Sequence, residues 1–227
     1  MFSQTLAGLL IVFLPGIALM AQETEVDYLH ENSLVVEFGR YRGVQGTAYR
    51  YATFRPGVLY DAALNEYPVD SLNFNGFTSR FECVIDGELR ELAGHHFLRA
   101  RVRDDDGVEH TYGWAINPSL PDKYAELLFH GDFLTASMFY EVTNDYKGES
   151  SMGKPGRLAR FVSRSHYYAM VDGELVSLSM SPRRLAGDLG LREELTAYIK
   201  EHKLKTANRD DLLRILARAE ALLAGER

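Results

Sequence analysis

The sequence feature that most constrains the fold is the stretch from Leu98 to Ile116, which alternates between apolar and polar residues on both sides of one turn. Before the turn, the apolar residues alternate with Arg99, Arg101 and Arg103. After it, large residues alternate with small or polar ones, and the segment in between, Asp104 to Gly107, is acidic and ends in glycine. Alternation of period two on both sides of such a turn predicts a β-hairpin.

The length of the turn leaves two registers open. If Asp106-Gly107 alone forms the turn, the arginines share a face with the large residues that follow it. If Asp104 to Gly107 form a four-residue turn with a left-handed glycine, the register shifts by one residue and every facing pair changes. The large residues then join the apolar ones on a buried face, and Arg103 lies near Glu109 on the solvent face. We favour the second register because a half-buried antiparallel sheet needs one apolar face. The large residues are His110, Tyr112 and Trp114.

Four residues of this hairpin are the candidate binding residues: Arg99, Arg101, Tyr112 and Trp114. In the first register they form one cationic and aromatic face, which suits a sugar or an anionic polymer through stacking and cation–π contacts. In the second register the arginines lie on a solvated strand face and the aromatic residues belong to the core. The binding hypothesis therefore depends on the register.

The remaining pattern predicts an α+β fold. Asp86-Gly87 and Asp172-Gly173 each separate two strand-like runs, which indicates two further hairpins. From Ser181-Pro182 onward the apolar spacing becomes helical, with one helix ending near Lys203 and a second capped by Asn208. We expect a β-rich body over residues 22–180, mainly antiparallel, forming a sandwich or an open barrel-like sheet of hairpins. A C-terminal pair of α-helices over residues 181–227 would pack on that body.

The N-terminus predicts export. Leu6 to Ala21 is almost wholly apolar but short for a membrane span, and small residues precede Gln22. We expect residues 1–21 to be a signal peptide cleaved near Ala21-Gln22, followed by an acidic, irregular segment up to Asn32. No second apolar run is long enough to span a membrane, and the single cysteine, Cys83, excludes an intrachain disulfide. These features favour a periplasmic, secreted or cell-surface location in a bacterium.

Each motif that resembles a catalytic or cofactor site lacks a residue or a structural context that such a site requires. Gly148 to Pro155 imitates a phosphate-binding loop, but proline replaces the required hydroxyl residue after Lys154, which argues against a nucleotide. The Ser-x-x-Lys spacing from Ser151 lies in a Gly/Pro loop instead of a helix. His95 and His96 would point to opposite faces of a strand, and no spacing of metal ligands is present. The net charge of −7 argues against nucleic acid. We expect no metal and no cofactor.

Three places carry a resemblance to a protein group. The first is Phe54-Arg-Pro-Gly-Val-Leu-Tyr60, which leads to Val69-Asp-Ser-Leu-Asn-Phe-Asn75 and Asp86-Gly-Glu-Leu89. The second is Phe139-Tyr-Glu-Val142, and the third, after the hairpin at Asp172-Gly173, is Tyr198 to Lys205 followed by Asp211-Leu-Leu213. In these the chain resembles uncharacterised exported β-rich proteins common in Bacteroidetes bacteria. The resemblance implies a signal peptide, a β-rich body and a helical tail, and it implies no activity.

Three functions remain open at this point. The leading hypothesis is a non-enzymatic envelope module that binds a protein or a glycan, because export and aromatic-rich β structure coincide with the failure of every catalytic motif. The second is a hydrolase of glycans or esters whose Asp, Glu or His residues assemble only in space. The third is a structural subunit that docks by its helical tail.

Overall fold

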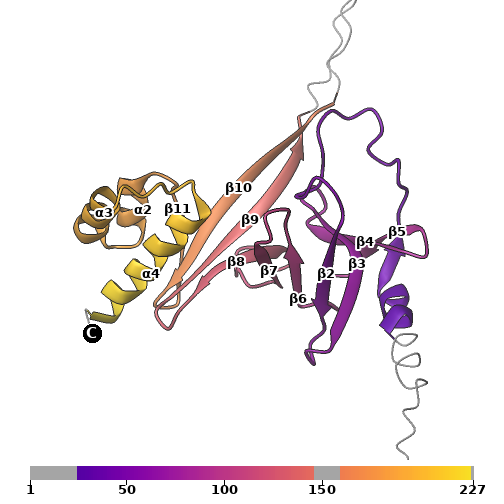
Figure 1. Ribbon diagram of the computed structural model, residues 1–227, viewed down its shortest axis with the longest axis horizontal. Coiled ribbons are helices and arrows are strands. Elements are labelled where there is room, and N and C mark those ends of the chain that lie inside the picture. The colour runs from indigo at the N-terminus through magenta and orange to yellow at the C-terminus, as the bar shows by residue number, and fades with distance from the viewer. Residues whose placement is uncertain (1–24, 146–158, 226–227) are drawn as a thin grey trace, which may run out of the picture.

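The computed structural model describes residues 25–145 and 159–225, and it confirms the broad α+β class. Eleven strands form one antiparallel sheet, which is followed by C-terminal helices (Figure 1). The strands are β1 (Ser33–Val35), β2 (Arg55–Tyr60), β3 (Glu66–Asn75), β4 (Arg80–Ile85), β5 (Glu88–Leu92), β6 (Arg99–Arg103), β7 (Glu109–Trp114), β8 (Tyr124–His130), β9 (Leu134–Asn144), β10 (Phe161–Val171) and β11 (Glu174–Leu178).

Hairpins build most of this sheet, whose strand order is β1-β5-β4-β3-β2-β6-β7-β8-β9-β10-β11. Both predicted Asp-Gly turns are confirmed: Ile85 pairs with Glu88 across one, and Val171 pairs with Glu174 across the other. The aspartate and the glycine of each turn have positive φ, 52° and 78° at Asp86-Gly87 and 51° and 82° at Asp172-Gly173. This is the type I′ geometry that fits the twist of the flanking strands.

The favoured register of the central hairpin is also confirmed. Ala100 lies opposite Tyr112, and Arg103 lies opposite Glu109. Gly107 has a φ of 80° and donates its N–H to the carbonyl oxygen of Asp104, which closes the longer turn. One face of the hairpin therefore enters the core, although Leu98, just before β6, remains 36% exposed.

The N-terminal half of the sheet is strongly bent. Three strands separate β5 from β6, a distance of roughly 19 Å in a flat sheet. Only six residues, 93–98, join these two strands, and some of them form a turn, so an extended path is not available. Bending brings the two sides of the sheet together: the ring of Phe81 on β4 lies 5.1 Å from that of Tyr112 on β7. The main hydrophobic core lies inside this bend.

A short helix over residues 25–31 covers one end of that core, where an irregular segment was predicted. The ring of Tyr28 stacks on Tyr67 of β3 at 4.7 Å and meets Phe97 edge-on. Aromatic packing therefore orders this acidic segment. The predicted signal peptide lies outside the described residues, as does the predicted loop that contains Ser151 and Lys154. No helix in the described part of the chain is both long and apolar enough to cross a membrane.

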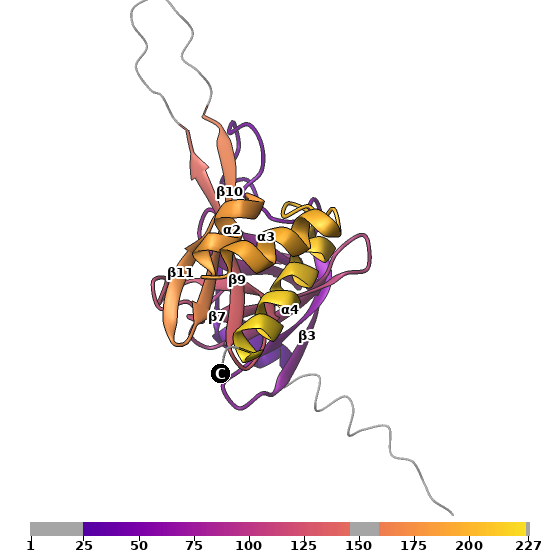
Figure 2. The same ribbon diagram turned by 90° about the vertical axis from the view of Figure 1, so that its left-hand side faces the viewer.

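Three helices follow the sheet instead of the predicted pair: α2 (Pro182–Asp188), α3 (Arg192–Glu201) and α4 (Arg209–Gly225). The expected first helix is interrupted at Gly190. Its φ of 75° is left-handed, so α2 ends there and the chain changes direction before α3. Pro182 begins α2, and Asn208 caps α4 by accepting the N–H of Asp211, as the sequence predicted. The helices cover β9, β10 and β11, as Figure 2 shows, and a second hydrophobic core lies between them and these strands.

Candidate binding surface

The four candidate binding residues do not share one surface. Tyr112 is only 1% exposed and belongs to the core, whereas Arg99 and Arg101 lie on the opposite, outer face of the sheet. Trp114 is half-buried on the inner face, where the guanidinium of Arg80 lies 4.6 Å from its ring centre. The register separates the cationic residues from the aromatic ones. A single face of stacked arginines and aromatics is therefore not present in this hairpin.

The outer face instead holds two adjoining hollows that meet at Arg101. The larger, of about 720 Å³, lies over β2, β3 and the β6–β7 hairpin, and the smaller, of about 380 Å³, extends toward Tyr60. We call this region the arginine surface. Its main polar and aromatic residues are Arg55, Tyr60, Glu66, Arg99, Arg101 and Glu109.

Strand pairing builds the arginine surface from distant parts of the chain. Tyr60 on β2 lies opposite Arg99 on β6, and Val58 lies opposite Arg101. The guanidinium of Arg101 lies 5.0 Å from the centre of the Tyr60 ring, a cation–π contact. Local alternation identified Arg99 and Arg101 but could not identify Tyr60, because β2 and β6 are not adjacent in sequence.

Charges on the arginine surface are mixed. Arg101 lies 3.6 Å from the Glu66 carboxylate and 3.8 Å from that of Glu109. Ion pairs this exposed contribute little to stability, but they hold the arginine in place and reduce the local positive charge. The surface therefore offers hydrogen-bond donors and acceptors side by side, and it does not have the excess of positive charge that an anionic polymer needs.

Two arginine N–H groups of this surface lack a hydrogen-bond acceptor. The Nε atoms of Arg55 and Arg101 are buried, and neither has a partner among the described residues. Both arginines line the larger hollow. A buried donor without an acceptor costs free energy unless a water or a ligand pairs with it. Because both Nε atoms are closed to solvent, a molecule in the hollow would reach them only after the side chains moved, so these two donors alone do not identify a ligand.

A group of ionisable residues surrounds the buried side chains of His110 and Glu126, on β7 and β8. His110 contacts two carboxylates: its Nδ1 lies 2.8 Å from Glu126 Oε1, and its Nε2 lies 2.9 Å from Asp104 Oδ2. Arg209, at the start of α4, also donates to Glu126. We call Asp104, His110, Glu126 and Arg209 the histidine network. It ties the hairpin turn, β8 and the helices together.

Burial and hydrogen bonding compete in the histidine network. Burial disfavours the charged form of His110, but the hydrogen bonds to Glu126 and Asp104 outweigh it, so the pKa of His110 is raised. Burial would likewise raise the pKa of Glu126, yet His110 and Arg209 hold it below its usual value. A protonated imidazole between two carboxylates explains both shifts.

The histidine network has the residue types of a hydrolase site without its geometry. A general base needs a free imidazole nitrogen that reaches a nucleophile or a water. Both nitrogens of His110 contact carboxylates, and Glu126 is fully buried. No group of three or more His, Cys, Asp or Glu residues suited to a metal ion occurs in the described ranges. The contacts of this network indicate a structural role, in which it links the sheet to the helices.

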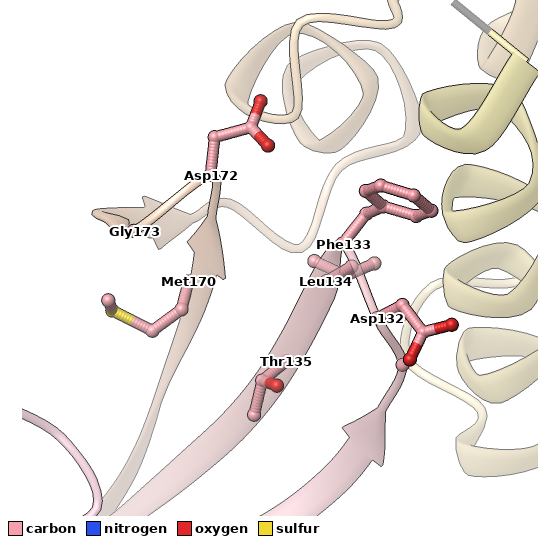
Figure 3. Close-up of a pocket in the computed structure, with 8 residues that line it drawn as sticks. Asp132, Phe133, Leu134, Thr135, Met170, Asp172 and Gly173 are labelled. Atoms are coloured by element: carbon pink, nitrogen blue, oxygen red, sulfur yellow. The ribbon is translucent and has the colours of Figure 1, made fainter. Parts of the chain in front are cut away.

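A third hollow, of about 450 Å³, lies between the β8–β9 turn and the β10–β11 turn (Figure 3). The carboxylate of Glu220 on α4 accepts the backbone N–H groups of Asp132 and Phe133, which fixes the first turn against the helix. The walls of the hollow are formed largely by turn residues, so we assign no function to it.

The remaining reactive side chains do not form a site. Cys83 is buried in the core, and burial raises its pKa to about 12, so the thiol is inert at neutral pH. His95 and His96 lie in a turn with ring centres 4.1 Å apart, which differs from the strand with opposed side chains that was expected.

Comparison with known proteins adds nothing to this geometry: no family model, curated protein or solved structure matches the chain.

Proposed function

We propose that the protein is an exported, non-enzymatic binding module that holds a glycan or a protein partner on the arginine surface. The observation that carries the proposal is the pair of adjoining hollows on the outer face, where Arg55 and Arg101 lie beside the Tyr60 ring. The bend of the sheet supports the predicted open, barrel-like arrangement, whose outer wall would be the binding face.

The partner is expected to supply uncharged or singly charged acceptor atoms. Hydroxyl oxygens of a glycan and carbonyl oxygens of a polypeptide both fit a surface where arginines alternate with Glu66 and Glu109. Tyr60 adds one aromatic ring beside the donors, which suits the apolar face of a sugar or a small side chain.

The two alternative functions receive less support. A hydrolase would need a free base, whereas both nitrogens of His110 are occupied by carboxylates. Docking by the helical tail would need an open apolar stripe, whereas Leu212, Ile215 and Leu216 of α4 are buried in the second core.

A paired arginine substitution tests the binding surface. The double variant Arg55→Gln and Arg101→Gln removes two guanidinium groups that line the larger hollow, and we expect at least ~10-fold weaker binding to the partner. Binding is measured against soluble envelope polysaccharides and biotinylated envelope proteins from the source bacterium. The matched control is Arg183→Gln with Arg184→Gln, two exposed arginines on α2 that lie outside this surface.

The control also defines the negative result. Equal loss of binding in both double variants would point to nonspecific charge and would contradict the proposal. The unfolding midpoint in urea is measured for each variant, so that loss of fold is separated from loss of binding.

Export is tested independently of the ligand. The mass of the protein purified from its own cells is expected to correspond to a chain that begins at Gln22. A mass that includes Met1 would remove the proposed periplasmic or cell-surface location.

A further inference from the structure

The turn of the central hairpin connects the arginine surface to the histidine network. Asp104, at the start of this turn, lines the larger hollow together with Arg55 and Arg101. The carboxylate of Asp104 also lies 2.9 Å from Nε2 of His110, which is buried on the core side of the sheet. One aspartate therefore belongs both to the wall of the hollow and to the histidine network.

Asp104 also fixes the shape of the turn. Its Oδ1 accepts the backbone N–H groups of Asp106 at 3.0 Å and of Val108 at 2.8 Å. The intervening Asp105 forms an ion pair with Arg55, which lines the hollow. This ion pair restrains Arg55 only as long as the turn keeps its shape, and the shape depends on how the Asp104 carboxylate is held.

The two carboxylate contacts of His110 require a protonated ring. A neutral imidazole carries one N–H group, whereas His110 contacts Glu126 through Nδ1 and Asp104 through Nε2. When the proton is lost, one carboxylate faces a nitrogen lone pair at hydrogen-bond distance, and the two acceptors repel each other.

Asp104 is the carboxylate that a neutral ring releases. Glu126 is fully buried, and its Oε2 has no hydrogen-bond partner among the described residues, so the loss of a further donor there is costly. The side chain of Asp104 is 24% exposed and can turn toward water. The remaining proton of His110 therefore stays on Nδ1, facing Glu126.

We propose that the shape and charge of the larger hollow follow the protonation of His110, so that ligand affinity on the arginine surface depends on pH. The protonated ring holds Asp104 and the turn in place. Loss of the proton leaves the Asp104 carboxylate unbalanced beside the hollow and frees the turn that restrains Arg55. The effect on affinity rests on the proposed function of this surface, whereas the change in the hollow is measurable without a ligand.

The groups around His110 and Glu126 set the pH range of this change. Burial lowers the pKa of His110, but its hydrogen bonds to the two carboxylates raise it, and the net shift is upward although Arg209 opposes it. The ring of Tyr51 lies 5.8 Å from the imidazole, and burial raises the pKa of Tyr51, so it stays neutral. The groups are Asp104 from the turn, Glu126 from β8, Arg209 from α4, and Arg50 and Tyr51 from the segment before β2.

The sign of the effect follows from the charge. The proposed ligand supplies acceptor atoms, so its affinity falls as the pH rises through the pKa of His110 and the hollow becomes more negative. Linkage is reciprocal, so a bound ligand raises the pKa of His110 in turn. Carboxylates and guanidinium groups in general change charge well outside the range in which a histidine does.

The first measurement follows the hollow without a ligand. NMR titration from about pH 6 to about pH 9 records the imidazole of His110, the Nε–H signal of Arg55 and the amides of Asp106 and Val108. We expect the Arg55 and amide signals to shift with the same midpoint as the imidazole. A titration of His110 that Arg55 does not follow would overturn the proposal.

Two variants test whether His110 is the cause. His110→Gln removes the titrating group, and Asp104→Asn keeps an oxygen for the N–H groups of the turn but removes the charge that His110 contacts. In both, the Arg55 signal is expected to lose its pH dependence. His166→Gln is the matched control, because His166 also lies 3.1 Å from a carboxylate, that of Glu141, but does not line the hollow. An Arg55 response that persists in both test variants would contradict the proposal.

The second measurement uses the same envelope polysaccharides and biotinylated envelope proteins as the test of binding. The Kd of the wild type is expected to be at least about 3-fold higher at about pH 9 than at about pH 6, whereas that of His110→Gln stays constant. Binding by the wild type that does not change with pH would refute the link to affinity. If nothing binds at either pH, the proposed function fails, while the ligand-free titration still decides whether the hollow follows His110. Circular dichroism verifies the fold of each variant.

Discussion

Glu82 and Glu126 are both fully buried glutamates on central strands of the same sheet, yet their surroundings differ. Glu82 on β4 receives hydrogen bonds from Tyr49 and Asn75 and pairs with one cation, Arg40. Burial dominates there, and the pKa of Glu82 is raised. Glu126 on β8 instead contacts His110 and Arg209.

The comparison teaches that the number of cationic partners decides the state of a buried carboxylate. Neutral donors and one cation do not offset the desolvation of Glu82, and Glu91 nearby adds a second negative charge. His110 and Arg209 together do offset the desolvation of Glu126, whose pKa is lowered. Glu126 is therefore a charged junction between sheet and helices, whereas Glu82 anchors the loop that carries Arg40 and Tyr49.

The largest expected effect separates the two glutamates directly. Glu126→Gln leaves His110 and Arg209 without their shared anion, which is expected to cost about 3 kcal/mol of unfolding free energy. Glu82→Gln is expected to cost only about 1 kcal/mol, because Arg40 retains Glu91 at 3.5 Å. Urea denaturation of both variants measures the difference. If Glu82→Gln lowered the unfolding free energy as much as Glu126→Gln or more, the assigned difference between the two glutamates would be wrong.

A second prediction concerns the helix side of the junction. Arg209→Gln removes the link from α4 to Glu126 and is expected to cost about 2 kcal/mol. It also removes a positive charge that lowers the pKa of His110, so that pKa is expected to rise further, as measured by NMR titration. Arg214→Gln is the control: Arg214 lies on the same helix, is more exposed and, in the described part of the chain, forms one ion pair, with Asp211 at 3.8 Å. A pKa of His110 unchanged in Arg209→Gln would contradict the assigned coupling.

The smallest effect is a pH dependence. Because the pKa of His110 is raised in the folded state, its contribution to stability is complete below the usual value of 6.5 and is lost as the pH rises through the folded pKa. The loss is expected to be roughly 1 kcal/mol, the cost of one hydrogen bond. His110→Gln should remove this slope, and the exposed-residue variant His202→Gln should keep it. An unchanged slope in His110→Gln would assign the dependence to another group.

Local patterns predicted the parts of the fold that depend on neighbouring residues. The register of the β6–β7 hairpin followed from the need for one apolar face, and both type I′ turns followed from Asp-Gly pairs that tolerate positive φ. The break between α2 and α3 was missed, although Gly190 in the helical stripe marks it.

The candidate site depends on contacts that no local pattern encodes. Arg101 meets Tyr60 only because β2 pairs with β6, and that pairing follows from the bend of the whole sheet. Glu126 meets Arg209 across 83 residues of sequence. An isolated charged residue in an alternating strand indicates a solvent face in most proteins, so the burial of Glu126 could not be read from its neighbours.

The order of the strands has a consequence for how the chain folds. Of the ten ladders in the described sheet, eight join strands that follow one another in the chain, and all of these except β9–β10, whose strands are separated by residues 145–160, close over fewer than ten residues. The β2–β6 ladder is different, because it unites the β3–β5 segment with the β6–β11 segment. We expect the hairpins to form early and the two ladders between distant strands, β2–β6 and β1–β5, to set the folding rate, since both carry a long-range closure cost.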